Sequence, residues 1–253
     1  MAGHSKWKNI QRKKSAMDAK RGRLFTRLAR EIIIAAREGG GDPDTNPRLR
    51  MAIERAKANN MPKDKIINAI KRGTGELRGG GQLEEIFYEG YAPHGIAMMI
   101  YCVTDNRNRA LSEIRHMLNK HGGSLGESGS VAWQFRRMAY FSIPAEGNDP
   151  DEILDLAIDA GAEDVAFDEY QIEIFAPVEA FKAIGDRLRA AGVQVQEAGI
   201  KMIPLQKISL PPEQAAQVLK VIEALEDLDD VQEVYANLDI SDEAVAEYEK
   251  MTA

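Results

Sequence analysis

The sequence has few of the residues that build disulfide or metal frameworks. Cys102 is the single cysteine in 253 residues, which excludes a disulfide framework and a cysteine-based zinc cluster. No apolar run approaches the length of about 18 residues that a membrane-spanning helix requires. The first 15 residues lack the apolar core of a secretory signal. We therefore expect a cytoplasmic protein without membrane association, with a core that needs no disulfide or metal.

Arrangements typical of catalysis are also missing. The four histidines follow no metal-binding spacing; they are His4, His94, His116 and His121. The segment 71–75 lacks the residue order of a phosphate loop. Cys102 lies in an apolar run and is expected to pack as a small hydrophobic residue. Acidic clusters at 151–168 and 223–230 are expected to be solvated. We predict no enzyme activity, no catalytic residue, no metal and no cofactor.

Charge is distributed unevenly along the chain. Residues 1–75 contain 19 Lys and Arg against 7 Asp and Glu, a net charge of +12. Residues 76–253 contain 14 against 33, a net charge of −19. A basic segment of this kind is attracted to a polyanion through counterion release, and the acidic remainder repels nucleic acid elsewhere. The asymmetry predicts a basic nucleic-acid-binding module attached to acidic domains.

Apolar periodicity predicts three helices in the basic segment. The first covers residues 18–37 and ends at the glycines that follow. The second begins at Pro47 and ends before Asn59, and the third begins at Pro62 and ends at Gly73. These helices indicate a small helical domain with a basic leader in front of it.

After residue 82 the pattern changes to short apolar runs typical of strands. Strands are expected at 86–88 and 96–103, and a helix at 105–120 with Asp105 as its N-cap. The next elements follow the split order of a ferredoxin-like unit, with strands and helices at 135–143, 149–160, 164–167, 170–175, 177–191 and 193–197. A last helix at 211–225 and a strand at 231–236 are expected to complete the sheet begun at 84–104.

The predicted fold class is therefore α+β with three domains. A basic helical domain at 1–77 precedes two ferredoxin-like α/β domains, one inserted in the other. The discontinuous domain comprises residues 83–132 plus 205–240, and the inserted domain comprises residues 133–204.

The basic leader and one later helix supply the candidate nucleic-acid-binding residues. The cations expected to contact phosphate are Lys6, Lys8, Arg12, Lys13, Lys14, Lys20, Arg21, Arg23, Arg27, Arg30, Lys63, Lys65, Lys71 and Arg72. Trp7 lies among them and either stacks on a base or packs against the domain. No helix shows a clean set of base-reading side chains, so the sequence specificity of binding does not follow from the sequence.

Two further segments leave alternatives open. Arg107 and Arg109 lie in the first turn of a helix, where the helix dipole favours acids. They form either a second recognition surface or ion pairs with nearby acids. The Gly-rich loop at 122–130 either connects domains or forms a nest of N–H groups that binds an anion.

Several segments along nearly the whole chain resemble one family. They are residues 1–7 (MAGHSKW), 58–63 (ANNMPK), 71–75 (KRGTG), 88–95 (YEGYAPHG), 105–109 (DNRNR) and 129–133 (GSVAW). In these motifs the chain is similar to the YebC family. The resemblance implies one helical and two α/β domains and a cytoplasmic DNA-binding transcriptional regulator. A mitochondrial relative is a translational activator, and bacterial members are linked to ribosomes stalled on proline-rich sequences. The family has no agreed catalytic residues.

Two functions follow from the residues and the resemblance. The first is a DNA-binding transcriptional regulator that binds the phosphate backbone, with the helix at 62–72 as candidate groove-reading element. The second is a translation factor or activator that binds the ribosome or ribosomal or transfer RNA and relieves stalled elongation. An enzyme with its site between the α/β domains is disfavoured, because no constellation of catalytic roles is visible. The sequence defines no oligomeric state and is compatible with a monomer.

Overall fold

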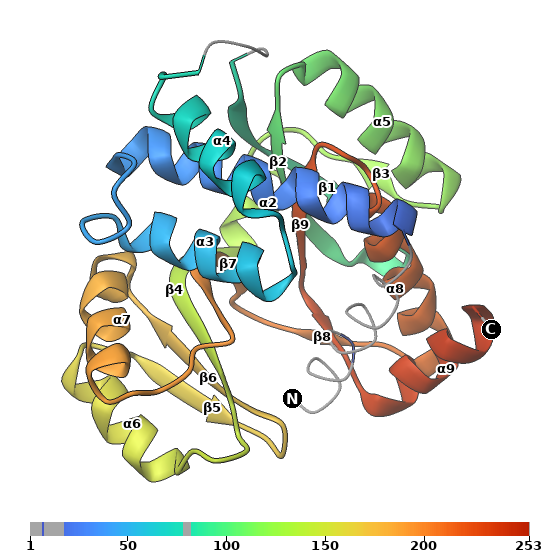
Figure 1. Ribbon diagram of the computed structural model, residues 1–253. Helices are drawn as coiled ribbons and strands as arrows, with labels where there is room; N and C mark the ends of the chain where they lie inside the picture. Colours follow the sequence, from blue (N-terminus) through green and yellow to red (C-terminus); the bar gives the residue numbers. More distant parts are fainter. Residues whose placement is uncertain (1–6, 8–17, 78–81, 253) are drawn as a thin grey trace. The chain divides into compact units, whose positions relative to one another are not determined.

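A computed structural model describes residue 7 and residues 18–77 and 82–252 (Figure 1). These residues form two compact units, described separately here. Unit 1 comprises residues 31–77 and 137–201, and unit 2 comprises residues 7, 18–30, 82–136 and 202–252.

Three helices form the N-terminal part, and all three were expected. They are α2 (Asp18–Gly39), α3 (Pro47–Ala58) and α4 (Lys63–Gly73). The buried Asn46 joins α2 to α3: its Oδ1 accepts the N–H of Leu49, and its Nδ2 donates to the carbonyl oxygens of Ala35 and Gly40. One side chain thus caps the start of α3 and satisfies carbonyls at the end of α2.

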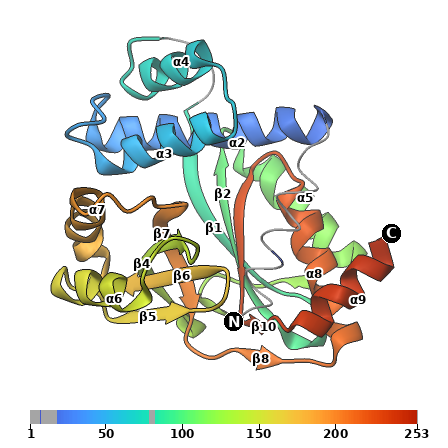
Figure 2. The ribbon, with the colours of Figure 1, turned by 60° about the horizontal axis from the view of Figure 1, so that its bottom comes forward.

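Unit 1 continues into an antiparallel sheet with two helices (Figure 2). Its elements are β4 (Phe135–Pro144), α6 (Pro150–Asp159), β5 (Asp164–Phe167), β6 (Gln171–Ala176), α7 (Phe181–Ala190) and β7 (Glu197–Pro204). The strand order is β5-β6-β4-β7, the order of a ferredoxin-like split unit. Apolar side chains from the sheet, α6 and α7 form one core, and Met51 of α3 packs against it.

Unit 2 is built on a second four-stranded sheet of order β3-β1-β2-β9. Its elements are β1 (Glu84–Tyr91), β2 (Ala97–Thr104), α5 (Arg107–Lys120), β3 (Ser124–Leu125), α8 (Pro212–Glu226), β9 (Val231–Ala236) and α9 (Asp242–Thr252). Residues of α5, α8 and α9 share one core with the sheet, and α8 and α9 lie side by side (Figure 2). A short parallel pair, β8 (Ile208–Ser209) and β10 (Leu238–Asp239), accompanies them. Strand β9, which lies about 130 residues after β2 in the chain, pairs with β2 as expected.

Three local predictions were wrong, and one helix was missed. Asn106, not Asp105, caps α5, because its side chain accepts the N–H of Arg109. The expected strand at 193–197 lies later, at β7: the N–H of Val193 instead closes the end of α7 on the carbonyl of Leu188. A short 3₁₀ turn, Val178–Ala180, precedes α7. Helix α9 was not expected.

The mixed α+β class, with a helical N-terminal part followed by two sheets, is confirmed. The three domain ranges 1–77, 83–132 plus 205–240, and 133–204 stay a prediction.

Candidate nucleic-acid interface

Helix α4 presents a basic, exposed face. Ile66 and Ala69 are buried and fix the orientation of the helix. A Cβ atom on Gly73 would lie 2.5 Å from the carbonyl oxygen of Ile33 and 2.6 Å from the Cβ of Ala36, so only glycine allows this close approach to α2. This close packing against α2 determines which side of α4 faces solvent.

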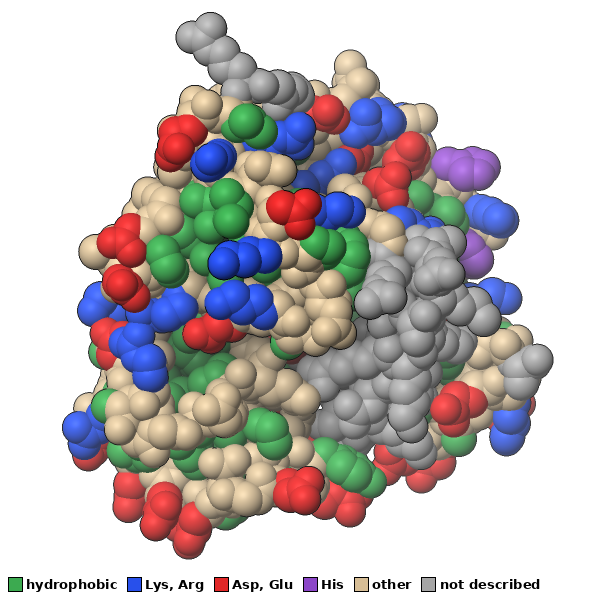
Figure 3. Space-filling view, in the orientation of Figure 1, with side chains coloured by type: hydrophobic (Ala, Val, Ile, Leu, Met, Phe, Trp, Pro, Cys, Tyr) green, Lys and Arg blue, Asp and Glu red, His purple; other side chains and the backbone are tan. Residues whose placement is uncertain are grey.

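The solvent side of α4 carries the cations that the sequence singled out. Lys63, Lys65, Lys71 and Arg72 are exposed. Among the described residues, the side chains of Lys63, Lys71 and Arg72 make no hydrogen bond or ion pair, whereas Lys65 has a partner. Figure 3 shows Lys and Arg side chains distributed over the surface of α3 and α4. Lys63, Lys71 and Arg72 can therefore bind phosphate without breaking a contact among the described residues.

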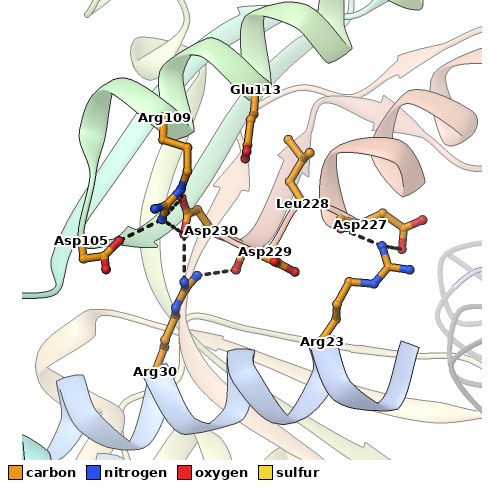
Figure 4. A pocket seen from close by; sticks show the side chains of 9 residues that line it. All are labelled: Arg23, Arg30, Asp105, Arg109, Glu113, Asp227, Leu228, Asp229 and Asp230. Atoms are coloured by element: carbon orange, nitrogen blue, oxygen red, sulfur yellow. Dashed lines mark hydrogen bonds and ion pairs between the residues drawn. The ribbon is translucent and has the colours of Figure 1, made fainter. Parts of the chain in front are cut away.

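Three arginines of α2 have partners at the end of α8 and in the turn that follows it. Arg23 donates to the carbonyl oxygen of Asp227 at 3.0 Å, and Arg27 to that of Glu226 at 3.4 Å. Arg30 donates to the carbonyl oxygen of Asp229 and pairs with the Asp230 carboxylate at 2.9 Å (Figure 4). One face of α2 thereby binds the carbonyl-rich C-terminal end of α8, where the helix dipole favours cations. Arg23, Arg27 and Arg30 thus bind oxygen atoms of the chain itself, and their contact with phosphate, which would have to replace these partners, stays a prediction.

Asp230 is the centre of this network. Its side chain is only 2% exposed and accepts from Arg30, Arg109 and the hydroxyl of Thr104. Arg109 also pairs with Asp105, and this hydrogen bond holds the pKa of Asp105 below its ordinary value. Arg107 pairs with Glu84. The two arginines therefore form ion pairs, and the alternative of a second recognition surface at Arg107 and Arg109 is not supported.

A cavity of about 780 Å³ lies over this network in unit 2 (Figure 4). Three arginines and five acids line it, together with Leu228: Arg23, Arg30, Arg109, Asp105, Glu113, Asp227, Asp229 and Asp230. The formal charge of the lining is net negative, because five carboxylates face three guanidinium groups. An anionic ligand such as a phosphate group is disfavoured there.

Part of the basic leader lies outside the described residues. This holds for Lys6, Lys8, Arg12, Lys13 and Lys14, and also for the side chains of Lys20 and Arg21, which belong to α2. Their assignment to phosphate binding stays a prediction.

Trp7 packs rather than stacks on a base. Its side chain is 4% exposed, and its ring meets that of Tyr248 edge to face at a centroid distance of 4.7 Å. It belongs to the core of unit 2 together with residues of α5, α8 and α9. The prediction that Trp7 binds nucleic acid is corrected, because a ring enclosed on this core presents no face to a base.

The end of the Gly-rich loop at 122–130 and the two residues that follow it at 131 and 132 bind a carboxylate of the chain itself. Glu89, 7% exposed, accepts the N–H groups of Gly129, Val131 and Ala132 at 2.6, 2.8 and 2.9 Å. Burial alone would raise the pKa of Glu89, but the three N–H donors outweigh it and hold the pKa below its ordinary value. The carboxylate of Glu89 thus occupies the N–H of Gly129 at the end of the loop and those of the two residues Val131 and Ala132 after it.

Unit 1 contains a buried polar cluster on its sheet. Tyr140 donates to Glu173 at 2.6 Å, and burial raises the pKa of this tyrosine far above its ordinary value. Lys201 pairs with Glu197 at 2.6 Å and lies over the Tyr140 ring at 4.3 Å from its centroid. The charges of Lys201 and Glu197 are paired and Glu173 is hydrogen-bonded, which is what buried charged groups require.

Three other features remain: the cysteine, possible metal ligands and possible membrane-spanning helices. Burial raises the pKa of the Cys102 thiol to about 12, and the side chain is fully enclosed, so it behaves as a small hydrophobic residue. Among residues 7, 18–77 and 82–252, no three His, Cys, Asp or Glu side chains converge as metal ligands. None of the helices described is both long and apolar enough to cross a bilayer.

Sequence reasoning missed Glu89 and Asp230. Glu89 carried no charge partner in the sequence, because its partners are backbone N–H groups 40 to 43 residues away. Asp230 lay in an acidic cluster expected to be solvated, although the arginines of α2, spaced four and three residues apart, could have indicated a common partner.

The fold and this surface define a multidomain α+β protein that presents a basic helix. The chain belongs to the TACO1/YebC family: residues 5–76 match the TACO1/YebC protein N-terminal domain, and residues 83–238 match the second and third domain.

Relatives over the full length carry regulatory names. "Probable transcriptional regulatory protein" is the name of a relative from Thermosipho melanesiensis, 53% identical over 98% of this chain and 97% of its own. The same name is given to one from Rubrobacter xylanophilus, 51% identical over 98% and 99%. The crystal structure of a conserved hypothetical protein from Aquifex aeolicus is similar at a TM-score of 0.81, with 48% identity over 89% of this chain and 93% of that one. These names support a role in transcription regulation.

Proposed function

We propose that this chain is a DNA-binding transcriptional regulator that holds the phosphate backbone through its basic N-terminal part, and that it is not an enzyme. The observation that carries the proposal is the solvent face of α4, where Lys63, Lys71 and Arg72 are exposed and uncommitted among the described residues. The names of the relatives support the regulatory role.

We also propose that the basic leader binds phosphate. The cations concerned are Lys6, Lys8, Arg12, Lys13, Lys14, Lys20 and Arg21. Asn68 is also exposed on α4 and without a hydrogen bond among the described residues, and an amide of this kind can read adenine in a major groove.

The test measures affinity for a 30-base-pair duplex against salt concentration. Affinity falls as salt rises, and each phosphate contact contributes about 0.9 to the steepness of log K against log salt. Changing Lys63, Lys71 and Arg72 together to Glu should therefore make this dependence shallower by roughly 2 to 3. The matched control changes Arg115, Lys120 and Lys220 to Glu, which alters the net charge of the chain equally but lies on α5 and α8 of unit 2. An equal loss in both variants would refute the assignment of the surface.

The alternative is a translation factor that binds RNA or the ribosome. It is favoured by the composition of α4, where cations outnumber the single exposed amide, because RNA duplexes are recognised largely through phosphate and shape. Crosslinking in cells followed by sequencing separates the two functions. Reads at a few promoters that disappear in the α4 variant would support the regulator, and reads in ribosomal or transfer RNA would replace it by the translation factor.

A further inference from the structure

Trp7 connects the basic leader to the core of unit 2. Its side chain is 4% exposed and belongs to the core that residues of α5, α8 and α9 share. The indole meets the ring of Tyr248 on α9 edge to face at 4.7 Å between centroids. Tyr248 is itself fully buried, and its hydroxyl donates to the carboxylate of Glu223 on α8. A partner that is held by two helices therefore fixes the position of the indole.

The chain is thus fixed to unit 2 on both sides of a basic stretch. One point is Trp7, and the other is the start of α2 at Asp18. Residues 8–17 lie between these points and contain four cations and no acid: Lys8, Arg12, Lys13 and Lys14. Eleven residue steps span about 40 Å at most, so both points limit how far these cations can move. A tail attached at α2 alone would carry them through a larger volume.

The neighbours of Trp7 in the chain point to a role beyond the stability of the core. Lys6 and Lys8 flank this buried residue directly. Lysine is almost never fully buried, so its charged end extends to water even where the main chain lies close to a core. Two cations beside a fixed indole are therefore presented at the surface of unit 2 rather than at the end of a free tail.

We infer that Trp7 is a positioning residue for phosphate binding by the basic leader, and that α9 takes part in that binding through Tyr248. The contact holds the cations of residues 6–17 close to unit 2 before a polyanion arrives, which reduces the entropy lost on binding. The inference rests on the proposed function. It adds an element to it, because α9 (Asp242–Thr252) follows the residues 83–238 that match the second and third domain of the family.

The first test measures the affinity of the full chain for the 30-base-pair duplex. Trp7→Ala should weaken binding about 5- to 50-fold, because each long side chain that is ordered only on binding costs about 2- to 10-fold. The steepness of log K against log salt should not change, because every cation is still present. Changing Lys13 and Lys14 to Glu should instead make it shallower by about 2. Trp7→Phe keeps a ring next to Tyr248 and should retain most of the affinity.

Two further variants separate positioning from a loss of stability. Leu118→Ala opens a cavity in the same core but keeps both rings, so the folded variant should bind the duplex as the natural chain does. Tyr248→Ala should weaken binding as Trp7→Ala does. The double variant should bind no more weakly than the weaker single variant, because both substitutions remove the same contact.

A lengthened leader tests the same inference without changing the core. An insertion of ten Gly and Ser residues after Ser15 keeps Trp7, Tyr248 and every cation, and doubles the length of chain between Trp7 and α2. It should weaken duplex binding about 3-fold, because effective concentration falls as roughly the −3/2 power of tether length. This variant decides the question if Trp7→Ala does not fold.

The fluorescence of Trp7 reports whether the contact persists in the complex. Trp7 and Trp133 are the only tryptophans of the chain, and Trp133 is 71% exposed. In a Trp133→Phe variant, the emission of Trp7 is followed with and without the duplex. We expect blue-shifted emission that is protected from acrylamide in both states. A shift to the red on binding would mean that Trp7 leaves the core, which would overturn the inference.

The remaining outcomes distinguish this inference from the proposed function. Heparin serves as a second polyanion, because counterion release does not depend on base sequence. A natural chain that binds neither the duplex nor heparin would refute both. Duplex binding that is unchanged in Trp7→Ala, or weakened equally in Leu118→Ala, would refute the positioning role alone. Tighter binding by Trp7→Ala would also refute it, because the contact would then keep the leader away from phosphate.

Discussion

Glu89 and Asp230 are two buried carboxylates with opposite kinds of partner. Glu89 is satisfied by three backbone N–H groups, and Asp230 by two guanidinium groups and a hydroxyl. A buried charge is tolerated only when it is paired or hydrogen-bonded. Both residues therefore hold segments together that are far apart in the sequence: β1 with the turn before β4, and α2 and α5 with the turn before β9.

At the residue scale we predict that Glu89→Gln destabilises the protein at neutral pH by about 1 to 3 kcal/mol, because an amide replaces a buried charged acceptor. The pKa of Glu89 is lowered in the folded state, so its contribution is present above the ordinary value of 4.5 and is lost as pH falls through the folded pKa. Urea denaturation at pH 7 and near pH 4 measures both variants. The difference in unfolding free energy should shrink in acid, and a constant difference would contradict this account.

At the element scale, the contact of α4 with α2 depends on one glycine. We predict that Gly73→Ala costs about 1 to 3 kcal/mol, because the added Cβ would meet the backbone at Ile33 and the side chain of Ala36. Gly75→Ala is the control: its φ is +80° but no atom lies within 4 Å of an added Cβ, so the cost should be limited to about 1 kcal/mol of backbone strain. Chemical denaturation of both variants measures the cost in stability. The affinity of each variant for the DNA duplex tests whether the packing of α4 on α2 also positions the basic face.

The helices and strands were predictable where local patterns decide them. Pro47, Pro62 and Pro150 indicated the starts of α3, α4 and α6, because proline is favoured at or just before the first turn of a helix. The strand order of unit 1 followed from the succession of elements between β4 and β7. The occupied arginines of α2 could not be predicted, because their partners lie about 200 residues later in the chain and depend on tertiary packing.

At the scale of the whole molecule, each of the two units has a large hydrophobic core among the described residues, and these two cores share no residue. One is built on the sheet of unit 2 with α5, α8 and α9, and the other on the sheet of unit 1 with α6 and α7. Separate cores support separate unfolding transitions. The main chain nevertheless passes from one unit to the other within α2, β4 and β7.

We therefore predict two transitions in scanning calorimetry, each tied to one core. Leu118→Ala should lower the transition of unit 2, and Ile174→Ala that of unit 1, each by an amount that corresponds to about 2 to 5 kcal/mol. A single transition that both variants lower equally would mean that the shared helix and strands couple the units into one cooperative block.

The enclosure of Cys102 has a practical consequence. Thiol-directed reagents attack the thiolate, and a thiol that is fully buried with a pKa of about 12 holds almost none at neutral pH. A maleimide dye or spin label should therefore not react with the natural chain. Any cysteine introduced on the surface would then be the sole attachment point, and no native residue would have to be replaced before distances across the molecule are measured by spectroscopy.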